Sequence, residues 1–155
     1  MKKVIFVASS GGHLTEILKL DKIFKNYEYM LVTEETDLTL NLKNGYNNVK
    51  FLKYGPNKNI FKYIYGTIYN TFKCLNIAFK FKPDTVVTTG AQIGGIMCIA
   101  CKLTGSKVIY IESIARIDSL SRTAKNLYHF ADKFYVQWES LAKKYKKAEY
   151  IGRLI

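Results

Sequence analysis

Short apolar runs alternate with longer amphipathic stretches along most of this chain. Seven runs rich in β-branched and aromatic residues are expected as strands, at 3–8, 28–33, 49–54, 84–89, 107–111, 133–137 and 149–151. Helical patterns lie between them, at 13–25, 59–82, 93–103, 120–131 and 139–146. Strands that are apolar throughout and alternate with helices predict a parallel sheet covered on both faces. The expected fold class is α/β, doubly wound, in one domain over residues 1–155, with a turn at Gly55-Pro56 after the third strand.

Ligands of such folds bind outside the carboxyl ends of the strands. The first strand runs into Ser9-Ser10-Gly11-Gly12-His13, and a helical pattern begins at once. Unpaired amides and the positive end of the helix dipole suit a phosphate or another anion here. His13 is expected to be neutral at this position and able to accept a proton. A plain strand–helix turn is the alternative on spacing alone.

Two later strand ends also carry polar residues. Thr89-Gly90 opens a second glycine-containing turn, fit for an anion or a closely approaching ligand. Glu112-Ser113 follows the fifth strand, with Arg116 a few residues later. The Glu112 carboxylate can orient a sugar hydroxyl or act as a base, and capping the next helix is its alternative role. For His129 on a helix face, a hydrogen-bonded structural role is favoured.

Nucleotide-binding fingerprints are incomplete in the first turn. It lacks the third glycine of G-x-G-x-x-G and the lysine of a Walker A loop. Glu34 or Glu35 stands about 20 residues on, as a ribose-binding acid would. A nucleotide-binding Rossmann protein, for example an NAD-dependent one, is therefore a weaker alternative.

Composition narrows the partners and the compartment. There are 24 Lys+Arg against 12 Asp+Glu, a net charge of +12 that implies a polyanionic partner, either nucleic acid or an anionic membrane surface. An odd count of three cysteines indicates a reducing compartment, and the Cys98/Cys101 pair is expected to be small hydrophobes on a buried helix. No apolar run reaches about 18 residues, so nothing is expected to span a bilayer.

The stretch 59–82 is predicted as a long amphipathic helix with one apolar stripe and lysines opposite. Part of the apolar face is expected to pack on the sheet. The surplus of aromatic and basic residues is typical of helices at membrane interfaces, where each lysine contributes about 1 kcal/mol. Since no nucleic-acid-binding motif occurs, an anionic membrane is preferred to nucleic acid. The residues expected to contact it are Phe61, Lys62, Tyr65, Ile68, Phe72, Lys73, Phe79 and Lys80.

Several of these motifs occur together, in the same order, in one known family. They include Ser9–Glu16 (Ser-Ser-Gly-Gly-His-Leu-Thr-Glu), Ile111–Arg116, Ala131–Trp138 and Tyr150-Ile151-Gly152. The chain resembles the acceptor-side, membrane-associated subunit of the split N-acetylglucosaminyltransferase that adds the second sugar of dolichol-linked N-glycan precursors. It is even more similar to that subunit's bacterial counterparts in capsule and exopolysaccharide operons. A more distant likeness is to the N-terminal half of the lipid I N-acetylglucosaminyltransferase of peptidoglycan synthesis.

The resemblance implies a GT-B enzyme, with two Rossmann-like domains, the active site between them and no obligatory metal. This chain would be the N-terminal half only. A UDP-sugar donor would then be bound by a separate donor-domain subunit, with no cofactor in this chain. The eukaryotic subunit of that family carries an N-terminal transmembrane anchor, and no counterpart of it is expected here. Peripheral attachment at the cytoplasmic face of the membrane would therefore rest on the 59–82 helix.

The leading hypothesis is the membrane-bound accessory half of a glycosyltransferase that extends a polyprenyl-diphosphate-linked saccharide. His13, and second Glu112, are the candidate catalytic residues. The residues expected at the acceptor or its diphosphate are Ser10, Gly11, Gly12, Thr89, Gly90, Ser113 and Arg116. No metal ligands and no nucleic-acid partner are expected. The main rival is a non-catalytic membrane adaptor that recruits a complete glycosyltransferase.

Overall fold

A computed structural model describes residues 1–54 and 59–154, so the predicted Gly55-Pro56 turn lies outside the described residues. All seven predicted strands are present in one parallel sheet of order β3-β2-β1-β4-β5-β6-β7. Their bounds are β1 (Lys3–Val7), β2 (Glu28–Glu34), β3 (Val49–Leu52), β4 (Thr85–Thr88), β5 (Lys107–Ile111), β6 (Lys133–Val136) and β7 (Ala148–Tyr150). The α/β, doubly wound fold is confirmed.

The helices agree less closely with the sequence pattern. They are α1 (Gly12–Leu18), α2 (Asp21–Phe24), α3 (Asp37–Leu40), the 3-10 helix η1 (Asn41–Asn44), α4 (Ile60–Phe81), α5 (Ala91–Leu103), α6 (Arg122–Leu127) and α7 (Glu139–Lys144). The prediction of a single helix at 13–25 is wrong, because the chain turns at Lys19-Leu20 between α1 and α2. The turn lets Phe24 stack on Phe6 of β1, with the ring centroids 4.1 Å apart. Helix α6 starts late because the Ser121 side chain caps it.

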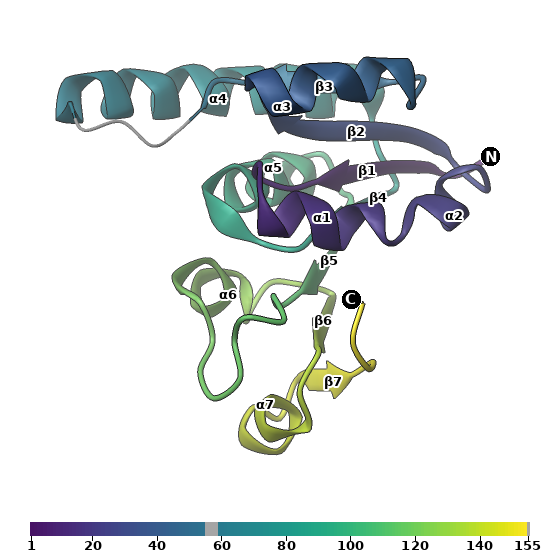
Figure 1. Cartoon of the computed structure of the whole chain (residues 1–155), viewed down its shortest axis with the longest axis vertical. Coiled ribbons are helices and arrows are strands. Elements are labelled where there is room, and N and C mark those ends of the chain that lie inside the picture. Colours follow the sequence, from purple (N-terminus) through teal and green to yellow (C-terminus); the bar gives the residue numbers. More distant parts are fainter. Residues whose placement is uncertain (55–58, 155) are drawn as a thin grey trace.

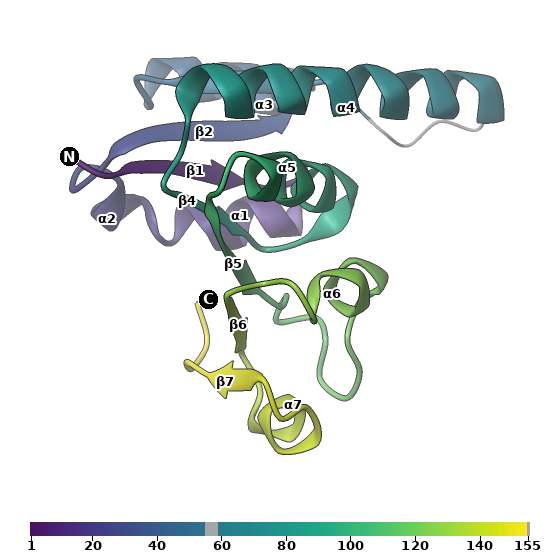
Figure 2. The ribbon, with the colours of Figure 1, turned by 180° about the vertical axis from the view of Figure 1, so that it is seen from behind.

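Helices cover both faces of the sheet, as Figures 1 and 2 show. Side chains of α4, α5, α6 and α7 pack on one face, in a core that includes Ile5, Val86 and Phe134. The two short helices α1 and α2 cover the other face, over Phe6 and Leu31. Strand β2 pairs with one side of β1 and β4 pairs with the other side, so the order of the strands reverses at β1. The turns after β1 and β4 therefore flank the position where such sheets form a ligand crevice.

Candidate functional site

The two predicted glycine turns meet at the carboxyl ends of β1 and β4. The Thr89 hydroxyl donates a hydrogen bond to the His13 carbonyl, 2.8 Å away. Gly90 has φ +113°, and a Cβ there would lie 3.4 Å from His13 Cε1 and 2.8 Å from the Tyr110 hydroxyl. A side chain at Gly90 would be strained by its backbone and would crowd both rings. The glycine therefore lets the His13 ring lie against the second turn.

His13 itself is half-buried at the start of α1. Its Nδ1 is buried and has no hydrogen-bond partner among the described residues. Buried polar atoms without a partner are uncommon in native structures. Because the surrounding atoms enclose Nδ1, an acceptor would have to approach the half-buried imidazole from another side.

Glu112 does not fit the predicted role of a base facing an acceptor. Its side chain is fully buried, and both carboxylate oxygens accept hydrogen bonds. Oε1 accepts from the Tyr110 hydroxyl (3.2 Å) and the Ser113 amide (3.0 Å), and Oε2 accepts from the Ser121 amide (2.8 Å). Burial, and then the Glu112 charge, raise the pKa of Tyr110 far above its usual value, so the phenol stays a donor. Glu112 thus holds the start of α6, which is the capping alternative.

Glu16 is a residue of this edge that the sequence reasoning missed. It is buried, and its Oε1 accepts from the Ser113 hydroxyl and the Ile114 amide, both at 2.9 Å. Helix α1 is thereby fastened to the loop after β5. The hydroxyl of Ser113, predicted to face the acceptor, points inward instead. A signal existed, because an acid three residues after His13 lies on the same side of a helix.

Glu34 plays a similar part on the other side of the first turn. Its Oε2 accepts from the Ser10 amide (3.1 Å) and the Ser10 hydroxyl (3.2 Å). The Ser10 side chain therefore points to β2, and Glu34 supports the turn, so the ribose-binding role considered for it does not fit. Thr89 is fully buried, and the Gly90 amide donates to Thr88 Oγ1.

Of the predicted site residues, Gly11, Gly12 and Arg116 are therefore exposed, and Ser10 and His13 are half-buried. Arg116 lies on the exposed loop between β5 and α6. The indole of Trp138 donates to the Ile114 carbonyl at 2.6 Å, and this bond fixes the loop near Arg116. Gln137 donates to the Glu112 carbonyl and accepts from the Leu154 amide. The Gln137-Trp138 motif is thus a structural support of the site.

The long amphipathic helix predicted at 59–82 is confirmed as α4. Its apolar stripe, however, does not face the sheet. Its buried residues are Asn70, Cys74, Ile77 and Ala78. The predicted apolar stripe, which includes Phe61, Phe72 and Phe79, lies roughly 150° round the helix from these buried residues, at about 100° per residue. It therefore faces away from the sheet. Phe61, Phe72 and Phe79 are 79%, 69% and 57% exposed.

The predicted membrane-contact residues are accordingly accessible: Phe61, Lys62, Tyr65, Ile68, Phe72, Phe79 and Lys80 are exposed, and Lys73 is half-buried. The first turns of α4 reach beyond the carboxyl ends of the strands (Figure 1). Asn70 holds the helix to the end of β3, accepting from the Lys53 amide (2.8 Å) and donating to the Lys53 carbonyl (2.9 Å). Within the described residues, no helix is both long and apolar enough to cross a bilayer.

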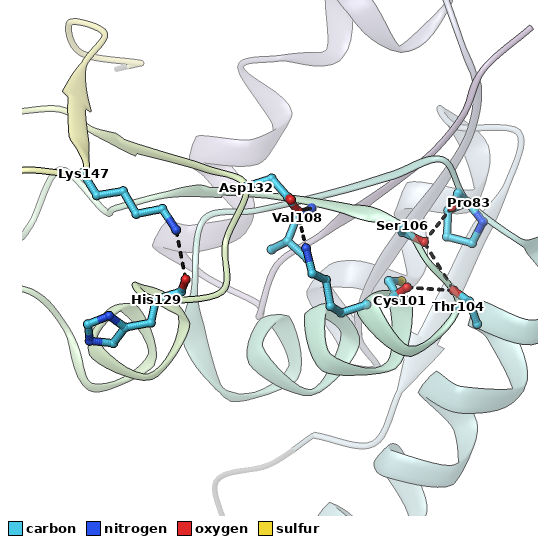
Figure 3. A network of polar contacts seen from close by, with 9 residues as sticks. Pro83, Cys101, Thr104, Ser106, Val108, His129, Asp132 and Lys147 are labelled. Atoms are coloured by element: carbon cyan, nitrogen blue, oxygen red, sulfur yellow. Dashed lines mark hydrogen bonds and ion pairs between the residues drawn. The ribbon is translucent and has the colours of Figure 1, made fainter.

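The opposite edge of the sheet, near the amino ends of the strands, is held by polar contacts outside the site (Figure 3). Asp132 Oδ2 accepts from Lys102 Nζ and the Val108 amide, both at 2.7 Å. Burial alone would raise the Asp132 pKa, but these hydrogen bonds lower it overall. His129 lies in this region with an exposed ring, and its carbonyl accepts from Lys147 Nζ. The hydrogen-bonded structural role favoured for the His129 side chain is therefore not confirmed, because the bond is made by the backbone carbonyl.

The three cysteines are buried hydrophobes, as predicted for Cys98 and Cys101. Burial raises the pKa of Cys74 and of Cys101 to about 12. Burial likewise raises the pKa of Cys98 well above its usual value. Thiols with such pKa values are unreactive near neutral pH.

The model of a known protein family matches most of this chain. Residues 56–154 match the model of a family described as "Oligosaccharide biosynthesis protein Alg14 like". The chain is also 30% identical over 178 residues to the human UDP-N-acetylglucosamine transferase subunit ALG14, covering 98% of this chain and 82% of the human subunit. The chain belongs to the Alg14-like family.

A second relative carries the same family name, and two solved structures share the fold. The subunit alg14 of Schizosaccharomyces pombe is 32% identical over 173 residues, with 97% of this chain and 82% of that subunit covered. Acinetobacter baumannii MurG has a TM-score of 0.75 at 19% identity, covering 90% of this chain. The UDP-N-acetylglucosamine 2-epimerase of Rickettsia bellii has a TM-score of 0.72 at 15% identity, covering 99% of this chain. This Alg14-family chain spans 43% and 45% of those two structures, so it has the fold of less than half of each.

Proposed function

We propose that this chain is the acceptor-side subunit of a two-component glycosyltransferase. The observation that carries the proposal is its membership of a family whose human member is named a UDP-N-acetylglucosamine transferase subunit. In this proposal a separate donor-domain subunit binds UDP-N-acetylglucosamine. The acceptor is a polyprenyl-diphosphate-linked saccharide of capsular or exopolysaccharide synthesis. The chain itself holds no cofactor.

Within the site, His13 accepts the proton of the acceptor hydroxyl. Its half-buried position beside Gly90, at the carboxyl ends of β1 and β4, supports this assignment. Gly11, Gly12 and Arg116 are the exposed groups among those expected at the acceptor diphosphate. Ser10, Thr89, Gly90, Glu112 and Ser113 hold these groups in place through the hydrogen bonds described above.

Helix α4 attaches the subunit peripherally to the cytoplasmic face of an anionic membrane. Support comes from an exposed stripe of aromatic and aliphatic side chains, flanked by Lys62, Lys73 and Lys80. Large exposed apolar surfaces rimmed by basic residues are typical of interfacial helices. The stripe reaches the same edge of the sheet as His13, which would keep a lipid-linked acceptor close to the site.

Reconstitution with the donor-domain subunit and a lipid-linked acceptor tests the proposal. The chain alone should be inactive, and the mixture should transfer N-acetylglucosamine. His13→Ala should lower the rate of the mixture about 10²–10⁴-fold, which is the usual size of general-base assistance. His129→Ala is the matched control, because His129 lies outside the site, and it should leave the rate unchanged. Robust transfer by the isolated chain would disprove the split-enzyme proposal.

A non-catalytic adaptor is the second candidate, and the buried position of Glu112 favours it. With Glu112 fixed by three hydrogen bonds, His13 is the sole remaining candidate base of the two that the sequence indicates. An adaptor needs no base, so an unchanged rate in the His13→Ala mixture would support this function.

A further inference from the structure

A second feature of α4 lies on its inner flank, away from the site. The helix and the outer strands enclose a groove of about 420 Å³. Its floor is apolar, formed by Met30 of β2 together with Ile77 and Phe81 of α4, and Met30 and Ile77 are buried. Its rim carries Lys50 of β3 and Lys73 and Lys80 of α4.

The charge of this groove is uniformly positive. Among the described residues, no acidic residue lines the groove. The salt bridges of the described chain are formed by lysines outside the groove. Glu28, two residues before Met30 on β2, is paired with Lys3 at 3.4 Å. Three lysines thus line one apolar floor with no acidic lining residue among them, and Lys73 Nζ also lies 5.4 Å from the ring centroid of Tyr69. The complementary ligand is therefore an anion with an apolar part.

The groove is continuous with the exposed stripe of α4. Lys73 and Lys80 directly follow Phe72 and Phe79 in sequence and lie about 100° further round the helix. When an interfacial helix buries its apolar face about 5–10 Å deep, residues on its flank lie at the level of the lipid headgroups. Lys73, Lys80 and the facing Lys50 are then at the depth of lipid phosphates.

From this arrangement we propose that the groove binds the headgroup of a single anionic glycerophospholipid. The phosphate lies among Lys50, Lys73 and Lys80, and the glycerol and first acyl carbons lie on Met30, Ile77 and Phe81. The proposal rests on the membrane attachment proposed above, but it adds a discrete, saturable site. A diffuse lysine surface would attract any anionic membrane without such a site.

A soluble short-chain lipid separates the site from membrane attachment. Dihexanoyl-phosphatidylglycerol, kept below its micelle concentration, is titrated into the ¹⁵N-labelled chain and followed by NMR. Saturable shifts confined to Lys50, Lys73, Asn76, Ile77 and Lys80 are expected. The phosphatidylcholine analogue and inorganic phosphate should each bind at least tenfold more weakly, because one lacks net charge and the other lacks an apolar part.

Two variants and one matched control complete the test. Lys50→Gln/Lys73→Gln/Lys80→Gln should weaken binding at least tenfold. The control Lys19→Gln/Lys22→Gln/Lys25→Gln removes the same charge from exposed lysines around α2, and should change it less than twofold. Asn76→Asp, nearly isosteric at an exposed lining position, should weaken binding about fivefold without unfolding the chain.

Shifts spread over all surface lysines, equal losses in both triple variants, or tighter binding of a short RNA to the same lysines would overturn the proposal. Failure of the chain to bind vesicles, with this titration unchanged, would count against membrane attachment and not against the site.

Discussion

Helices α4 and α5 lie side by side on the same face of the sheet (Figure 2), yet they use their apolar residues in opposite ways. Helix α5 buries Ile93, Met97 and Cys98 in the core. Helix α4 buries Asn70, Cys74, Ile77 and Ala78, and it exposes Phe61, Phe72 and Phe79. The comparison teaches that an apolar stripe in a sequence gives the period of a helix but not the direction in which the stripe faces.

The difference follows from where each helix lies. Helix α5 contacts β1, β4 and β5 as well as α4 and α6, so most of its circumference is covered. Helix α4 lies at the margin of this layer and contacts chiefly α5, and its first turns extend past the strands. One narrow side is therefore enough to dock α4, which leaves the apolar stripe free for another surface.

Truncating one apolar side chain on each helix tests the comparison most strongly. Met97→Ala should lower the free energy of unfolding by about 2–5 kcal/mol, because Met97 is fully buried. Phe72→Ala should change it by less than about 0.5 kcal/mol, because that side chain is 69% exposed. Urea denaturation of the two variants measures both values. Similar losses in both would show that the α4 stripe is packed in solution.

The exposed stripe should matter for vesicles and not for folding. Phe61→Ser/Phe72→Ser/Phe79→Ser should lower partitioning onto anionic liposomes about 100-fold or more, because burying each aromatic side chain is worth about 1.5–3 kcal/mol. Flotation measures the partitioning, and thermal melting checks that the fold is kept. If flotation stays normal while the melting point is also unchanged, another surface holds the membrane.

The docking of α4 should depend on a polar contact. Asn70→Ala leaves the amide and carbonyl of Lys53 without their partner, at a cost of about 1–3 kcal/mol. Asn76→Ala removes the same side chain from an exposed position of the helix and is expected to be near neutral. Equal stability of the two variants by urea denaturation would argue against the Asn70 clamp.

The end of α5 has a weaker, pH-dependent tether. The pKa of Asp132 is lower in the folded chain than in the unfolded chain. The stability that Asp132 contributes is therefore fully present above the unfolded pKa, and it is lost as the pH falls from there through the folded pKa. Because this side chain is 39% exposed, the expected contribution is below about 1 kcal/mol. Asp132→Asn should remove that pH-dependence between about pH 5 and pH 2. A native and a variant chain with parallel stability curves in this range would contradict the tether.

Much of the fold could be predicted from the sequence. The seven strands, their parallel pairing and the placing of two glycine turns at one edge follow from apolar runs that end in Gly-rich segments. Helix bounds could not be predicted as well, since the break at Lys19-Leu20 depends on the packing of Phe24 against Phe6.

The candidate site divides in the same way. The sequence by itself determined that His13, Gly90 and the segment after β5 gather at the carboxyl ends of the strands, because parallel strands bring those ends together. Only the tertiary structure decided which polar groups face outward. Glu16, Glu34 and Glu112 turn toward unpaired backbone amides of neighbouring loops, because a buried amide without an acceptor is costly. It also decided that α4 docks through Asn70 and Cys74, and so leaves its apolar stripe exposed.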